Sequence, residues 1–221
     1  MSIRPTRVDE ENWLNLEPIE PVSKLRPKPL RHTILIVGDA TCVWEDIAKM
    51  RALKVPHDTM LINHVALAYP YKYQHYVAGD SHMEDMQRIA AKVPDGVIKH
   101  CWNPNSKNFD VRWLQLDKAG WSGTTANLAV KISVILGYLK IVLAGVPMDF
   151  SGHWYDEFLP ENDRKRKSNH LHHLWKWNEL ACRPQARLMR SFSGNTRDNL
   201  GEPTREWLLD IPRSNNGGKP K

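Results

Sequence analysis

The stretch TILIVGDATCVWEDIAKMRA, residues 33–52, decides the fold of this chain. Its first five residues form a continuous and mostly β-branched apolar run that ends at Gly38, which predicts a strand buried on both faces. Apolar residues then recur at helical spacing, which predicts a helix over Cys42–Ala52. A buried strand that leads directly into a helix is typical of proteins with a parallel sheet.

The same alternation continues as far as residue 146. Helices are predicted over Ser81–Ala91, with Ser81 as its N-cap, and over Gly123–Leu136, with Gly137 as the residue that ends it. Further strands are predicted over the apolar runs Thr59–Ala68, His75–Ala78, Gly96–His100, Val111–Leu116 and Lys140–Val146. Regular alternation implies right-handed crossovers, so the sequence predicts a doubly wound α/β domain with a mostly parallel sheet.

The composition divides the chain into three parts. Residues 1–32 hold five of the fifteen prolines and are expected to form an arm that lies on the surface or docks on a partner. Residues 33–160 form the α/β domain. Residues 161–221 form a basic C-terminal extension, in which helices are predicted over Glu161–Arg190 and Pro203–Leu209.

The formal charge of +6 lies almost entirely in the last part. Residues 33–160 contain 12 basic and 13 acidic residues, whereas residues 161–221 contain 13 basic and 7 acidic residues. This basic segment would bind a nucleic acid or another acidic partner, cover the ligand-binding site, or only keep the chain in solution.

Composition also excludes several classes of protein. With 41% apolar and 25% charged residues, the chain is neither disordered nor collagen-like. Its three widely spaced cysteines suit a reducing compartment. The N-terminal residues contain no apolar signal segment, and the longest apolar run, Ile132–Met148, is interrupted by Lys140. We therefore expect a cytoplasmic protein without a membrane segment.

Candidate ligand-binding residues follow the predicted strands. In a doubly wound sheet, ligands bind beyond the carboxyl ends of the strands. In the first loop, Gly38 allows a phosphate to approach the backbone, Asp39 is expected to orient a ribose hydroxyl or hold a divalent cation, and Thr41 is a further candidate. An ordinary strand-to-helix turn is the alternative. Asp80, after the third strand, is also a candidate ligand for a nucleotide or its metal.

The turn before the predicted helix Gly123–Leu136 combines small residues with hydroxyl groups. Ser122, Gly123 and Thr124 would present hydroxyl and backbone N–H donors at a helix start, which is a favourable position for an anion. The alternative is that these hydroxyl groups serve only as N-caps.

The loop GVPMDFSGHWYDEF, residues 145–158, follows the last buried strand. A histidine titrates near neutral pH, so His153 is a candidate general base, with Asp149 expected to orient it. An inert loop histidine is the alternative. The histidines at 170, 172 and 173 complete no known ligand set, so no metal site is predicted.

The segment SGTTANLAVKISVILGYLKIVLAGVPMD, residues 122–149, followed by GHWYD, residues 152–156, resembles a Rossmann-like group of phage and bacterial proteins. This group includes the archaeal pterin diphosphokinase-like (MptE-like) proteins and the bacterial sialyltransferases of glycosyltransferase family 42. The resemblance covers residues 33–156. It implies that Asn63 contacts the nucleotide and that His153 is the base. Of the group's usual first loop, G-x-G-P-S-L, only Gly38 is retained.

The resemblance implies a Rossmann-like fold and a phage-type transferase that uses a nucleotide or nucleotide-sugar donor. A second possibility is a non-catalytic phage accessory or virion-associated protein, which binds nucleic acid or a phage protein through residues 161–221. A third is an ATP-dependent diphosphokinase that uses Mg²⁺ held by Asp39 or Asp80. The expected location is the cytoplasm, which is that of the host cell if the protein is phage-encoded, and association with the virion is the alternative.

Overall fold

A computed structural model describes residues 16–18, 31–103, 105–115, 124–158 and 173–211. Its centre is an eight-stranded sheet with the strand order β1-β6-β5-β4-β3-β2-β7-β8. The seven strands β2 to β8 are all parallel, and only the edge strand β1 pairs antiparallel, with β6. The protein therefore has a Rossmann-like α/β fold, as the alternation of strands and helices predicts.

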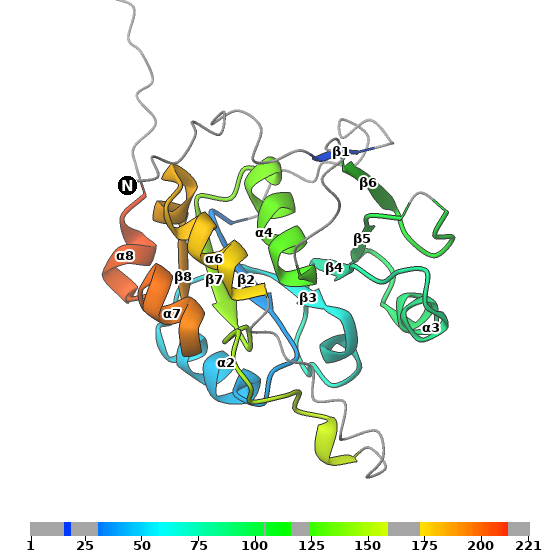
Figure 1. Cartoon of the computed structure of the whole chain (residues 1–221), viewed down its shortest axis with the longest axis horizontal. Helices are drawn as coiled ribbons and strands as arrows, with labels where there is room; N and C mark the ends of the chain where they lie inside the picture. The colour runs from blue at the N-terminus through cyan, green and yellow to red at the C-terminus, as the bar shows by residue number, and fades with distance from the viewer. Residues whose placement is uncertain (1–15, 19–30, 104, 116–123, 159–172, 212–221) are drawn as a thin grey trace, which may run out of the picture.

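The strands and helices are short and closely spaced (Figure 1). The strands are β1 (Leu16–Pro18), β2 (Thr33–Val37), β3 (Asp58–Ile62), β4 (His75–Ala78), β5 (Ile98–Cys101), β6 (Val111–Gln115), β7 (Lys140–Ala144) and β8 (Met189–Ser191). The described α-helices are α2 (Val43–Ala52), α3 (Glu84–Lys92), α4 (Thr125–Leu136), α6 (Leu174–Ala181), α7 (Gly194–Leu200) and α8 (Arg205–Leu209). The 3-10 helices are η2 (Asn63–Leu67), η3 (Asp156–Phe158) and η5 (Pro184–Leu188).

The direction of winding reverses between β2 and β7. Strands β3, β4, β5 and β6 follow one another on one side of β2, whereas β7 and β8 lie on its other side. The register pairs Thr33 with Lys140 and Val37 with Ala144, so β2 and β7 end level with each other. Their following loops must then diverge to opposite faces of the sheet, which opens a crevice at this point.

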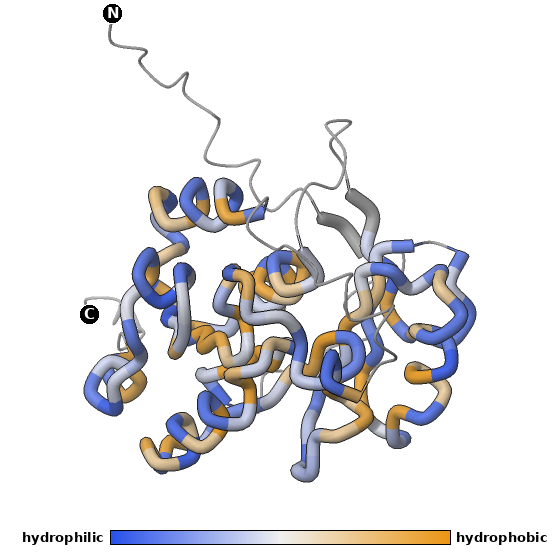
Figure 2. Tube along the Cα trace, turned by 60° about the horizontal axis from the view of Figure 1, so that its bottom comes forward, coloured by the Kyte–Doolittle hydropathy of each residue, from blue (hydrophilic) through white to orange (hydrophobic). Residues whose placement is uncertain are grey.

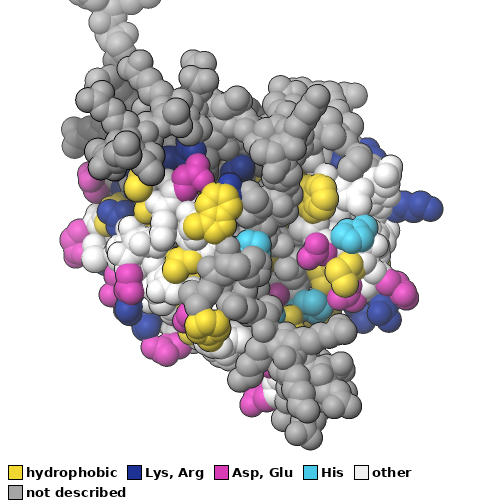
Figure 3. Space-filling view, viewed as in Figure 1, with side chains coloured by type: hydrophobic (Ala, Val, Ile, Leu, Met, Phe, Trp, Pro, Cys, Tyr) yellow, Lys and Arg dark blue, Asp and Glu magenta, His cyan; other side chains and the backbone are white. Residues whose placement is uncertain are grey.

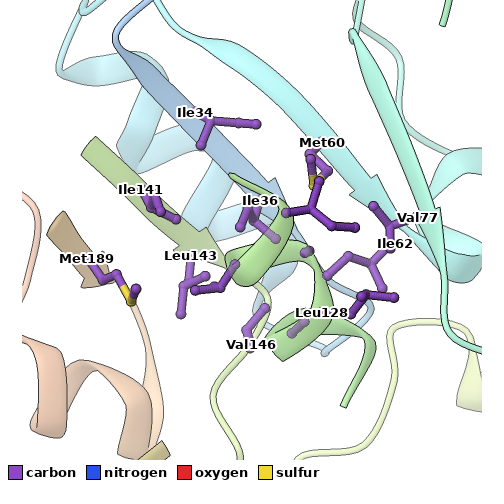
Figure 4. Close-up of a cluster of buried hydrophobic side chains, with 14 of the residues drawn as sticks. Ile34, Ile36, Met60, Ile62, Val77, Leu128, Ile141, Leu143, Val146 and Met189 are labelled. Atoms are coloured by element: carbon purple, nitrogen blue, oxygen red, sulfur yellow. The ribbon is translucent and has the colours of Figure 1, made fainter. Parts of the chain in front are cut away.

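Helices cover both faces of the sheet. Ile34 and Ile36 of β2 belong to a core shared with α4 and α6, whereas Leu35 and Val37 belong to a second core shared with α2 and α3. Figure 4 shows the first core, in which strand side chains gather beside Leu128 of α4. In Figure 2 the inner strands are mostly hydrophobic and the outer helices and loops more hydrophilic. Burial on both faces explains the continuous apolar strands.

A chain of polar side chains crosses the core on the α4 side. The Nε1–H of Trp113 donates to Nδ1 of His100 (3.2 Å), and His100 Nε2 lies 3.1 Å from His75 Nδ1. His75 Nε2 lies 3.2 Å from the hydroxyl of Tyr138, which donates to Asp58 Oδ2 (2.9 Å). An indole only donates and a carboxylate only accepts, so both histidines are neutral with the proton on Nε2. Burial lowers the pKa of His75 to about 4 and that of His100 well below its usual range.

Two of the elements predicted within residues 33–146 differ from the structure by three residues or more at one end. Ser81 is not an N-cap, because α3 begins at Glu84 and the buried Ser81 hydroxyl accepts a hydrogen bond from Ser106 (2.8 Å). The strand predicted over Thr59–Ala68 ends at Ile62, since Asn63 has a positive φ of 50° and begins η2.

The predicted helix Glu161–Arg190 is wrong in its second half. Among the described residues only α6 is α-helical there, and Pro184 begins the 3-10 helix η5, since proline lacks the N–H that an α-helix interior needs. Met189–Ser191 then forms β8, parallel to β7 with Met189 opposite Ile141. The sheet thus continues past residue 160, where the domain boundary was predicted.

Helix α8 begins later than predicted, and the described helices include no candidate membrane span. The helix expected over Pro203–Leu209 begins two residues later, as α8, because Thr204 is its N-cap and accepts from the N–H of Trp207 (3.2 Å). None of the described helices combines the length and apolar character that crossing a bilayer requires.

Candidate functional site

A pocket of about 420 Å³ lies at the point where the winding reverses, and we call it the switch-point pocket. Its described lining comes from the end of β3 and the loops after β2, β3, β4 and β7, from the first turns of α3 and α4, and from His173. Ser122 and Gly123 lie outside the described residues, and Thr41 lines a second pocket instead. Seven predicted site residues line the switch-point pocket, namely Gly38, Asp39, Asn63, Asp80, Thr124, Asp149 and His153.

Two glycines let the loops after β2 and β7 approach each other closely. A Cβ atom at Gly38 would lie 2.5 Å from the carbonyl oxygen of Gly145, and one at Gly145 would lie 2.8 Å from the Gly38 oxygen. Gly145 also has a positive φ of 65°. Any side chain at either position would push the two loops apart, so glycine at both positions keeps this part of the pocket close to the backbone.

Asp39 is buried and holds the start of η2. Its Oδ1 accepts from the N–H of Val65 (2.7 Å) and its Oδ2 from the N–H of His64 (3.3 Å). Burial raises the pKa of Asp39 to about 7, and the two backbone hydrogen bonds oppose that rise. The side chain therefore changes protonation state near neutral pH, inside the pocket where the sequence predicts a contact with ribose or metal.

Asn63 carries an acceptor that the protein leaves unsatisfied. Its Nδ2 donates to Thr125 Oγ1 (3.4 Å), but its Oδ1 is buried and has no hydrogen-bond partner among the described residues. Asn63 and Met148 both have positive φ values, 50° and 52°, and both line the pocket. Strained backbone and an unpaired buried acceptor are found together where a ligand completes a site.

The first turn of α4 also lines the pocket. Thr124 acts as the N-cap, because its hydroxyl accepts from the N–H of Asn127 (3.3 Å). Thr125 and Ala126 follow it in the lining, and an added Cβ at Gly79 would lie 2.6 Å from Thr125 Oγ1. The N–H groups of a first helical turn have no intrahelical acceptor, so this twelve-residue helix directs partial positive charge into the pocket.

His153 is held by a carboxylate and by the backbone. Its Nδ1 lies 3.4 Å from Asp156 Oδ1, and its N–H donates to Asp156 Oδ2 (2.8 Å). An antiparallel bridge pairs His153 with Ala40. The sequence predicts the orienting role for Asp149, but Asp149 Oδ1 accepts from the N–H of Ser151 (2.8 Å) and shapes the loop. Asp156 is therefore the carboxylate paired with His153.

A second histidine and carboxylate pair lines the same pocket, and the sequence gives no local signal for it. His64 Nε2 lies 3.3 Å from Asp85 Oδ2. Tyr155 lies between the two histidines, with ring centroids 4.9 Å from His153 at an interplanar angle of 7° and 5.0 Å from His64. Burial lowers the pKa of His64, while Asp85 opposes this shift.

Helix α7 fixes the loop after β7 from the other side. Thr196 Oγ1 donates to the carbonyl of Val146 (2.6 Å), and Asn195 Nδ2 donates to that of Met148 (2.8 Å). The buried carboxylate of Asp46 accepts from the N–H of Gly145 (2.9 Å). The C-terminal part of the chain thereby holds the wall of the switch-point pocket in place.

The described lining of this pocket is acidic. It contains three histidines, four aspartates and neither lysine nor arginine, and in Figure 3 histidine and acidic side chains lie next to one another on one face. The described residues offer no group of three or more metal-ligating side chains that could hold a metal ion. Mg²⁺ in proteins commonly takes part of its ligands from the phosphates of a bound substrate.

Fold and pocket together define a doubly wound α/β protein with a polar pocket at its switch point. No family model, no curated protein and no solved structure matches the chain. Its function is therefore inferred from the pocket itself.

Proposed function

We propose that this protein is a transferase that binds a nucleotide or nucleotide-sugar donor in the switch-point pocket and transfers a group to an acceptor hydroxyl. One observation carries the proposal. His153, paired with Asp156, lines the same pocket as the first turn of α4 and the two closely approaching glycines. Such a reaction requires a base, a helix start that binds the anionic donor, and exposed backbone that the donor can approach closely.

The donor would be held mainly by backbone groups. Gly38 and Gly145 let it approach the ends of β2 and β7, and the N–H groups at the start of α4 would bind its phosphates. The unpaired Oδ1 of Asn63 would accept a hydrogen bond from an N–H or O–H of the nucleoside. Thr41, Ser122 and Gly123 remain predicted donor contacts.

The transfer step would use His153 as a general base. Its contact with Asp156 favours a proton on Nδ1, so Nε2 takes the proton of the acceptor hydroxyl. The acceptor oxygen then forms a bond to the transferred group, and the bond from this group to the donor phosphate breaks. The electron pair leaves on the phosphate oxygen, whose negative charge faces the start of α4.

The acidic lining favours a second candidate, an ATP-dependent diphosphokinase. Four aspartates beside a polyphosphate would repel it unless a divalent cation lay between them. Asp39 or Asp80 would then hold Mg²⁺ together with the phosphates. In this reaction the acceptor oxygen binds the β-phosphorus of ATP, a diphosphate is transferred, and AMP leaves with the electron pair.

Thermal unfolding with a ligand panel tests the donor site. We expect ATP, a uridine or cytidine nucleotide, or one of their sugar conjugates to raise the melting temperature of the wild type, because a ligand that binds only the native state stabilises it. Asn63→Gly should reduce this shift while tolerating the positive φ. No shift with any nucleotide, with or without MgCl₂, would contradict the proposal, and a shift that requires Mg²⁺ would favour the diphosphokinase.

His153→Gln separates binding from chemistry. We expect this variant to keep the ligand-induced shift and to lose at least about a hundredfold in turnover, as for removal of a general base. The matched control is His82→Gln, since His82 is exposed and does not line the pocket. Equal loss of turnover in both variants would contradict the role of His153.

A further inference from the structure

A second pocket, of about 660 Å³, opens on the other side of His153, and we call it the aromatic pocket. Ser151 and His153 line both pockets. The remaining described residues of its lining are Thr41, Trp44, Trp154, Asp156, Glu157 and Phe158. The candidate base is thus accessible from two directions, as a base that acts between a donor and an acceptor must be.

Three aromatic rings form the walls of the aromatic pocket. The centroids of Trp44 and Trp154 lie 5.7 Å apart at an interplanar angle of 68°, and those of Trp154 and Phe158 lie 6.4 Å apart at 63°. Trp44 is 38% exposed and Phe158 is 72% exposed. Rings at such steep angles turn their faces in different directions around a cavity, and large exposed aromatic groups indicate an interaction site.

The described lining of the aromatic pocket is acidic. Its described lining contains Asp156 and Glu157 and neither lysine nor arginine, although the whole chain has a formal charge of +6. The face of an aromatic ring also carries negative potential, and ammonium groups bind between such rings. Carboxylates and ring faces together would attract a cation.

We propose that the aromatic pocket binds an ammonium group, and that the acceptor of the transferase is a cationic amino alcohol. The rings of Trp44 and Phe158 would hold the ammonium group, and the hydroxyl would extend toward His153. The role as acceptor rests on the proposed function, whereas the binding of a cation does not.

Choline and its neutral isostere 3,3-dimethylbutanol test this site, because they have the same shape and differ in charge. Titration calorimetry on the wild type should show choline binding about tenfold more tightly than the isostere. Trp44→Leu should weaken choline binding by about fivefold and the binding of the isostere by less, because leucine keeps apolar contact but has no ring face to attract a cation. Trp175→Leu, which replaces another exposed tryptophan outside both pockets, should change neither.

Several results would overturn the inference. Equal affinities for the two probes, or no choline binding at tens of millimolar, would show that the pocket does not select a cation. Binding of a neutral methyl glycoside instead of choline, lost in Trp44→Leu, would show a sugar site. Folding of each variant is checked by its melting temperature.

The two proposals fail separately, because choline binding is measured without nucleotide. Choline binding that depends on Trp44, together with no nucleotide binding, would retain the cation site and overturn the transferase. Nucleotide binding without choline binding would overturn the cation site and retain the transferase.

Discussion

Histidine and carboxylate side chains meet in two regions of this molecule, and the two regions treat them differently. In the core, His75 and His100 are neutral links in a chain of hydrogen bonds that ends on Asp58. At the switch-point pocket, His64 and His153 pair with carboxylates and remain partly exposed, with 30% and 19% of their side chains accessible.

The difference lies in which polar atoms the protein itself satisfies. Every ring nitrogen in the core chain has a partner within 3.2 Å, so the chain supports the fold and offers nothing to a ligand. The pocket instead contains the unpaired Oδ1 of Asn63 and the buried carboxyl of Asp39. The same residue types thus stabilise one region and leave the other prepared for a ligand.

The largest expected effect is the loss of stability in acid. His75 binds a proton near pH 6.5 in the unfolded chain but near pH 4 in the fold, and burial lowers the pKa of His100 well below its usual range. Their contribution is complete above pH 6.5 and decreases as the pH falls, by about 1.4 kcal/mol per pH unit for each histidine. Urea unfolding between pH 7 and 4.5 measures it, and an unchanged slope in His100→Gln would contradict the assignment.

Asp39 should act in the opposite direction. Its pKa is about 7 in the fold against 3.8 in the unfolded chain, so its contribution is present below pH 3.8 and is lost as the pH rises to 7. Relative to the wild type, Asp39→Asn should gain about 3 kcal/mol in free energy of unfolding between pH 4.5 and 7. Denaturant unfolding at both pH values tests this, and a difference independent of pH would contradict it.

Two matched tyrosine variants compare the regions directly. Tyr138→Phe leaves the Nε2–H of His75 without its acceptor and leaves Asp58 Oδ2 with only the N–H of Arg31, so it should lower the free energy of unfolding by about 2 kcal/mol. Tyr155→Phe keeps the ring between the pocket histidines and should change it by less than about 0.5 kcal/mol. Similar losses in both variants, measured by urea unfolding, would remove the distinction between the regions.

The smallest expected effect is an electrostatic one within the pocket. Positive charge on His153 lowers the pKa of His64 across the ring of Tyr155, so His153→Gln should raise the pKa of His64. Proton NMR titration of the ring C–H signals measures this shift. His82→Gln should leave the pKa of His64 unchanged. A fall in the pKa of His64 in His153→Gln would contradict the coupling between the two histidines.

The regular part of the fold can be predicted from the sequence because buried parallel strands leave continuous apolar runs. Val37 and Ala144 end such runs, and the loops that follow them meet at the pocket. β8, at Met189–Ser191, escapes prediction, since three residues carry no periodic pattern and the register comes from pairing with β7.

The position of the pocket can be predicted from the sequence, but the side-chain partners of its residues cannot be predicted as well. His153 lines the pocket at the strand end where the sequence places it, but its carboxylate partner is Asp156 rather than Asp149. Asp85 lies in α3 and His64 in η2, so their contact exists only in the folded chain. The rule for strand ends thus finds the pocket, whereas side-chain partners depend on loop geometry that spacing does not encode.

The hold of α7 on the loop after β7 has a consequence for biosynthesis. Asn195 and Thr196 supply the hydrogen bonds that fix Val146 and Met148, and they are synthesised after every other described segment of the pocket wall. Because a chain leaves the ribosome from its N-terminus, strands β2 to β7 can pair before these two hydrogen bonds form. The pocket wall is therefore fixed only after α7 has left the ribosome, so a nascent chain that stops before Asn195 lacks the two hydrogen bonds that hold Val146 and Met148.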